Sequence, residues 1–153
     1  MEFEVLHVLP FDSNRKRMSI ILRHPVTRER ILYCKGADSV IFPRIRPALA
    51  GSEEEENLEK TQNHLNVYAK QGLRVLVMAK RVFSDEEYEA WLELHEKAEN
   101  SMNMREKLLH DSYNRVEDKL TLLGATGIED KLQEGVPSVI ANLRAAGTIK
   151  AIF

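Results

Sequence analysis

The sequence lacks the residues on which several common kinds of protein site depend. It contains one cysteine, Cys34, among 153 residues, so it can form no internal disulfide and has no thiolate cluster for zinc. The five histidines show no metal-ligand spacing, and we predict no metal site. No apolar run approaches the roughly 20 residues that a membrane-spanning helix needs. A Gly-x-x-x-x-Gly-Lys-Ser/Thr loop is also absent, which excludes a P-loop nucleotide site.

An excess of positive charge is also lacking. The 22 basic and 24 acidic residues leave a formal net charge of −2, so there is no overall positive field to hold a polyanion. The basic run from Arg15 to Arg17 is short and has no interleaved aromatic residue, which makes nucleic-acid binding the weakest hypothesis. We therefore predict no nucleic-acid partner.

What the sequence does contain is a series of β-rich runs separated by helical stretches. With 43% hydrophobic and 30% charged residues, the chain has the size and apolar content of one main domain with a core. The predicted strands are residues 3–9, 18–24, 29–35, 73–82 and 120–126. The second and third are joined by the short turn Pro25–Arg28, which favours a hairpin. We predict an α+β fold, a largely antiparallel sheet flanked by helices and a helical hairpin.

Serine residues mark the starts of two longer helical stretches. Ser52 with Glu55 and Ser84 with Glu87 have the spacing of a capping box. The helices are expected at a short segment from residue 37, from 53 to a stop at Gly72, in a hairpin over 84–119 with a loop at 100–103, and at 137–146.

Three short motifs hold residues suited to a nucleotide. They are Phe11 to Met18 (FDSNRKRM), Lys35 to Asp38 (KGAD) and Gly72 to Arg81 (GLRVLVMAKR). Within the first, Ser13, Lys16 and Met18 are candidates to line a pocket, whereas Arg15 and Arg17 are expected to point outward.

Each motif has a structural alternative. Phe11 offers a face on which adenine can stack, worth about 1–3 kcal/mol, but on the sequence alone a core position is favoured. Lys35 ends a strand before Gly36, whose missing Cβ lets a ligand approach the backbone; the alternative is a solvated lysine. Arg74 opens an apolar run, where its charge needs a partner, either a phosphate oxygen or a carboxylate.

Together, in this order and spacing, the three motifs resemble the nucleotide-binding domain of P-type ATPases, and most closely the type IV branch, the lipid flippases. The resemblance implies that Phe11 stacks on adenine, that Lys35 lines the adenine and ribose pocket, and that Arg74 contacts the phosphates. It places Ser13, Lys16, Met18 and Gly36 less firmly at the same site.

Near the end, the stretch from Leu123 to Pro137 is similar to the hinge that returns to the phosphorylation domain in this family. The resemblance implies a nucleotide-binding domain at 1–126 that lacks its front part, a hinge at 127–133, and a truncated start of the phosphorylation domain at 134–153. The final residues, 148–153, depart from the family pattern.

The resemblance implies that this cytosolic domain holds ATP and presents it to the phosphorylation domain of an integral membrane, phospholipid-translocating enzyme. The partners would be ATP, the phosphorylation and actuator domains of the same full-length chain, and phospholipid through a transmembrane region. Magnesium belongs to the full-length enzyme. The phosphorylated-aspartate motif is absent, so we assign no catalytic residue and expect this chain alone to be inactive. The alternative is a protein-interaction module, in which the hairpin with Trp91, Met102 and Met104 docks a partner and the nucleotide pocket is vestigial.

Overall fold

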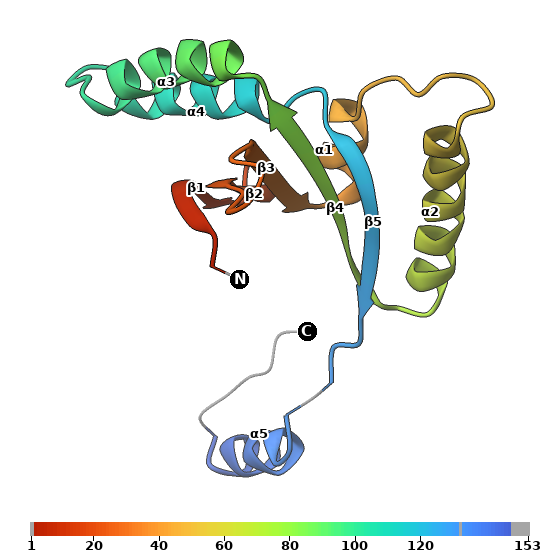
Figure 1. The fold of residues 1–153 in the computed structure, drawn as a ribbon. Helices are drawn as coiled ribbons and strands as arrows, with labels where there is room; N and C mark the ends of the chain where they lie inside the picture. Colours follow the sequence, from red (N-terminus) through yellow and green to blue (C-terminus); the bar gives the residue numbers. More distant parts are fainter. Residues whose placement is uncertain (1, 132, 148–153) are drawn as a thin grey trace.

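The computed structural model describes residues 2–131 and 133–147, and its centre is a five-stranded antiparallel sheet (Figure 1). The strands follow one another in sequence order, β1-β2-β3-β4-β5. Their bounds are β1 Glu4–Asp12, β2 Arg17–Arg23, β3 Arg30–Gly36, β4 Arg74–Phe83 and β5 Thr121–Ile128. The predicted α+β class and antiparallel sheet are confirmed.

The helices flank this sheet. They are α1 (Asp38–Ile41), a 3₁₀ turn η1 (Phe42–Arg44), α2 (Glu53–Lys70), α3 (Asp85–Glu99), α4 (Arg105–Val116) and α5 (Val136–Ala145). Helices α3 and α4 form the predicted hairpin, and α2 runs beside β5 (Figure 1). None of the helices in the described ranges is both long and apolar enough to cross a membrane.

The serine caps account for where the longer helices begin. The Ser84 hydroxyl accepts a hydrogen bond from the Glu87 amide, and the Glu87 carboxylate accepts one from the Ser84 amide, which completes the capping box of α3. At α2, Ser52 accepts from the Glu55 amide, but the Glu55 carboxylate accepts from Gly51 instead. The second box is therefore only half formed.

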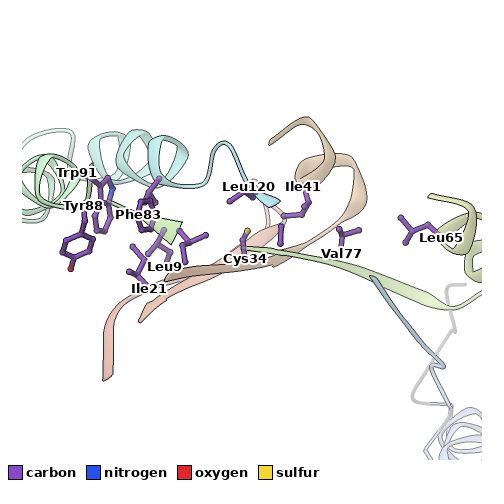
Figure 2. Close-up of a cluster of buried hydrophobic side chains, with 13 residues drawn as sticks. Leu9, Ile21, Cys34, Ile41, Leu65, Val77, Phe83, Tyr88, Trp91 and Leu120 are labelled. Atoms are coloured by element: carbon purple, nitrogen blue, oxygen red, sulfur yellow. The ribbon is translucent and has the colours of Figure 1, made fainter. Parts of the chain in front are cut away.

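One face of the sheet carries the core. Leu9, Ile21, Cys34 and Val77 come from four successive strands and point to the same side, where the helices cover them (Figure 2). Leu120, just before β5, is fully buried with them. The residues that alternate with these core residues along each strand point to the opposite face. Helices α1 to α4 bring their buried residues to the core side, so within the described residues no helix covers that opposite face (Figure 1). That face is where the candidate site lies.

Helix α5 stands apart from the sheet. It contains no buried residue, and it lies beyond the end of β5, away from the other helices (Figure 1). Strand β5 continues to Ile128, which pairs with Arg74, so the sheet extends two residues into the predicted hinge. The domain boundaries stay a prediction, and residues 132 and 148–153, including the divergent tail, lie outside the described residues.

A cluster of aromatic and histidine side chains packs between β1 and helix α3 of the hairpin. His7 Nε2 lies 3.0 Å from the Tyr88 hydroxyl, and the His95 ring stacks on Trp91 at 4.7 Å. The two imidazoles are 5.4 Å apart. Burial lowers the pKa of both histidines below 6.5, against the opposing attraction of Glu99 and Glu96.

We therefore expect the chain to lose stability in mild acid. Because the folded-state pKa values are depressed, the unfolded chain takes up protons first, so stability is full above pH 6.5 and falls as the pH drops through the folded values. Urea unfolding at about pH 7.5 and about pH 5.5 measures this. The slope should persist when the exposed His64 is replaced by Gln and shrink in His95→Gln; equal slopes in both variants would contradict the assignment.

Candidate functional site

The open face of the sheet brings two of the predicted residues together. Met18 pairs with Lys35, and Lys35 pairs with Met78, so the three lie side by side across β2, β3 and β4. They line a cavity of about 270 Å³. The other residues around it are Val8, Ser19, Ile20, Tyr33, Cys34, Ala79 and Leu123. The lining is mostly apolar, with the lysine as its one charged side chain.

The chemistry of this cavity suits binding rather than reaction. The Cys34 side chain points to the core on the other face of the sheet, so its thiol is not offered to a ligand in this cavity. Burial also raises the pKa of that thiol to about 11, which keeps the sulfur protonated. Lys35 makes no ion pair within the described residues, so its ammonium is available to a ligand. The described residues contain no group of three His, Cys, Asp or Glu side chains able to hold a metal ion.

Phe11 is not part of this cavity. It is 63% exposed and lines a separate hollow of about 570 Å³ against α4, beside His110 and Tyr113. The register of β1 shifts between Leu9 and Asp12, which disturbs the alternation that would set the direction of the Phe11 ring. The structure does not bring Phe11 and Lys35 to one hollow, and Ser13 lies exposed in the turn after β1.

Arg74 lies on the same side of the sheet as Met78 but far along the strand. They are four positions apart on β4, or about 13 Å. The guanidinium of Arg74 pairs with the carboxylate of Asp130, and both side chains are about 70% exposed. Of the two partners that the sequence left open for Arg74, the carboxylate is the one seen here.

The expectation that Arg15 and Arg17 point outward was wrong. Both are buried, at 3% and 2% exposure, because their guanidinium groups meet the fully buried carboxylate of Glu117. Arg15 Nη1 donates to Glu117 Oε2 at 2.7 Å, and Arg17 Nε donates to the same oxygen at 2.6 Å. Ser19 Oγ donates to Oε1 at 2.6 Å. These arginines are therefore unavailable to any nucleic acid.

Lys16, between the two buried arginines, stays exposed. Its backbone is left-handed (φ 51°), its amide donates to Asp12 O at 2.7 Å, and its carbonyl accepts from the Ala37 amide at 3.1 Å. The turn is thus tied to the end of β3, next to Lys35. Sequence reasoning missed Asn114, on α4, and Glu117, which caps the C-terminal end of α4. Both side chains hold this turn, and nothing in their local sequence marks them.

Gly36 has a structural role that the sequence did not reveal. A Cβ there would lie 2.5 Å from Arg17 Cβ and 2.7 Å from Lys16 O. The missing side chain makes room for the neighbouring strand, because β2 and β3 approach closely at this point. A role for Gly36 at the nucleotide site stays a prediction.

The helical hairpin offers less to a partner than predicted. Trp91 is buried at 6% exposure and its indole N–H donates to Ser112 O at 3.1 Å, so it belongs to the core. Met102 and Met104, at the tip, are exposed. Two methionines at a loop are a small apolar surface for a docking site.

Comparison with known proteins settles the family. Residues 1–135 match the family described as P-type ATPase, cytoplasmic domain N. The chain belongs to the P-type ATPase family. It is 55% identical over 152 residues to Phospholipid-transporting ATPase VD of Macaca fascicularis, covering 96% of this chain and 23% of that protein. It is 53% identical over 151 residues to human Phospholipid-transporting ATPase VA (96% and 10%), and 44% identical over 144 residues to human Phospholipid-transporting ATPase ID (94% and 11%).

This P-type ATPase chain therefore spans less than a quarter of the length of these relatives. Its matched part is domain N, and the five-stranded sheet described above is the fold of that domain. The cavity with Met18 and Lys35 lies on the open face of this P-type ATPase domain.

We expect Gly36→Ala to destabilise the domain even without ligand. The added methyl meets backbone and Cβ atoms that cannot move freely, so the free energy of unfolding should fall by about 1–3 kcal/mol. Urea unfolding of the ligand-free chain measures the change. Unchanged stability combined with weaker ligand binding would instead restore the reading in which Gly36 serves the ligand.

Proposed function

We propose that this chain is an ATP-binding domain whose open sheet face holds the nucleotide base. The observation that carries the proposal is the apolar cavity in which Met18 and Lys35 meet, in a chain that belongs to the P-type ATPases as domain N. A flat, polarizable base suits an apolar hollow, and the lysine supplies the one polar group that fixes its orientation.

The size of the cavity decides which part of ATP it takes. Ligand pockets usually measure about 300–1,000 Å³. At about 270 Å³ this hollow is suited to the base, with the ribose and phosphates outside it. The exposed Lys16 and Arg74 are the cations proposed to bind the phosphates. Arg74 can bind a phosphate only after its ion pair with Asp130 has opened. Phe11 is proposed to stack on the base from the rim, which requires its exposed ring to turn away from α4.

For the whole protein, we propose phospholipid transport driven by ATP. The relatives are named phospholipid-transporting ATPases, and each is several times longer than this chain. The domain at 1–126 would present ATP across the hinge at 127–133 to the phosphorylation domain, with the actuator domain and the membrane region completing the cycle. Magnesium would accompany the phosphates there, where phosphoryl transfer needs charge neutralisation.

ATP should bind weakly and at a defined place. With the phosphates in solvent, the dissociation constant should be on the order of millimolar, or about −4 kcal/mol. Amide NMR during an ATP titration should show saturable shifts at Met18, Lys35 and Met78, and Lys35→Ala should weaken binding. The matched control is Lys107→Ala, in the hollow that Phe11 lines against α4. If Lys107→Ala weakens ATP binding and Lys35→Ala does not, the base binds in that hollow and not in the cavity with Lys35.

Breaking the ion pair of Arg74 should strengthen ATP binding. Phosphate competes with the Asp130 carboxylate for the same guanidinium, so Asp130→Asn should lower the dissociation constant for ATP about twofold, the scale of an exposed ion pair. Adenosine, which has no phosphate, should bind both proteins equally. Arg74→Ala should remove the gain; a gain that survives in the double variant would exclude Arg74 as the phosphate ligand.

A further inference from the structure

We propose that Glu117 is a positioning residue for the nucleotide site: from the opposite face of the sheet, it fixes the turn that carries Lys16 and the strand end that carries Lys35. The inference rests on the proposed function for its consequence, ATP affinity, but its geometry stands on the contacts alone. Glu117 itself is fully buried and is not among the residues that line the cavity. Its direct contact with a lining residue is the hydrogen bond from Ser19, whose hydroxyl donates to Oε1 at 2.6 Å.

The first step is that the C-terminal end of α4 holds the turn around Lys16 through hydrogen bonds. One carboxylate oxygen of Glu117 accepts from Arg15 Nη1 and Arg17 Nε, on the two sides of Lys16. Asn114, one helical turn earlier, accepts from Arg17 Nη2 at 2.6 Å. Both arginines are thereby drawn to the helix-covered face, which leaves Lys16 as the exposed residue between them.

Two further contacts hold the Arg15 side chain in place. Its Nη2 donates to the carbonyl of Pro10 at 2.7 Å, and its guanidinium lies 4.7 Å from the centre of the Tyr113 ring. Arg17 Nη1 donates to the Arg15 carbonyl at 3.1 Å. The start and end of the turn are therefore locked to each other as well as to α4.

The second step carries this constraint to the lysine of the cavity. The Lys16 carbonyl accepts from the Ala37 amide at 3.1 Å, and Gly36 packs against Arg17 with no room for a Cβ. Lys35 precedes these two contacts directly. A change in how Arg17 is held therefore moves the end of β3, and with it the distance between Lys35 and Met18.

The third step is that the stability of the fold alone does not require an ionic cluster at this place. A buried ionic cluster is often no more stable than an apolar replacement of similar volume, and what directional bonds add is a defined geometry. Replacing the cluster with apolar side chains therefore tests the two roles separately: a purely stabilising role predicts unchanged ATP binding, and a positioning role predicts weaker ATP binding.

The test uses two changes in the 153-residue chain. Asn114→Ala removes one bond to Arg17 and leaves Glu117 in place; it also removes the contacts of Asn114 with Arg44 and His110. The triple variant Arg15→Met, Arg17→Met, Glu117→Leu replaces the whole cluster with apolar side chains. The matched control is Ser112→Ala, which removes a buried hydrogen bond from the same helix, to His95.

We expect Asn114→Ala to raise the dissociation constant for ATP about fivefold, the equivalent of one ordinary hydrogen bond. The triple variant should resist urea at least as well as the native chain and still bind ATP at least as weakly as Asn114→Ala. Amide exchange at Ala37 should accelerate in both variants relative to other β-sheet amides. In Ser112→Ala, both ATP affinity and Ala37 exchange should match the native chain.

Native ATP affinity together with native Ala37 exchange in both variants would overturn the positioning role. Equal effects in Ser112→Ala would overturn it too, since they would trace to general loosening of α4. If the native chain fails to bind ATP, the proposed function falls, and Ala37 exchange alone then decides the positioning role: acceleration in both variants upholds it, and no acceleration refutes it.

Discussion

The structure depends most on one buried carboxylate that holds two guanidinium groups. Glu117 joins α4 to residues about 100 positions earlier in the chain, at Arg15 and Arg17. Removing one member of such a cluster costs about 3–5 kcal/mol, because a charge is then left buried without its partner. That is a large share of the stability of a domain of this size, so the contact between the first hairpin and the helical hairpin is strongly specified.

This contact also assigns the faces of the sheet. Along β2, Arg17 and Ser19 turn toward Glu117, so Met18 and Ile20 turn toward the open face. A slip of one residue in β2 would exchange the two sets, exposing the arginines and burying the cavity lining. Gly36 keeps β3 close enough to β2 for the register to hold. Packing on the helical side thus determines which side chains the open side presents.

The sequence predicted elements better than it predicted contacts. Strand and helix bounds followed from apolar runs and from serine caps such as Ser84, which are local signals. The direction of Phe11 depends on a register shift within β1, and the burial of Arg15 and Arg17 depends on a glutamate far along the chain. Alternation along a strand places a basic residue outward only if no buried partner waits on the inner side. The residues around Arg15 and Arg17 do not show which distant side chain will pair with them, so the sequence alone does not predict this contact.

The separation of Lys35 from Arg74 fits the task proposed for the domain. If the base occupies the cavity and Arg74 lies about 13 Å farther along β4, the phosphates extend along β4 toward the hinge. A domain that enclosed all of ATP would stabilise the bound nucleotide equally before and during transfer, and such uniform binding does not speed the chemical step. A domain that holds only the base leaves the terminal phosphate free for a nucleophile elsewhere. Weak binding by a pocket that holds only the base would fit the proposed delivery of ATP, and the small cavity and exposed Arg74 are consistent with it.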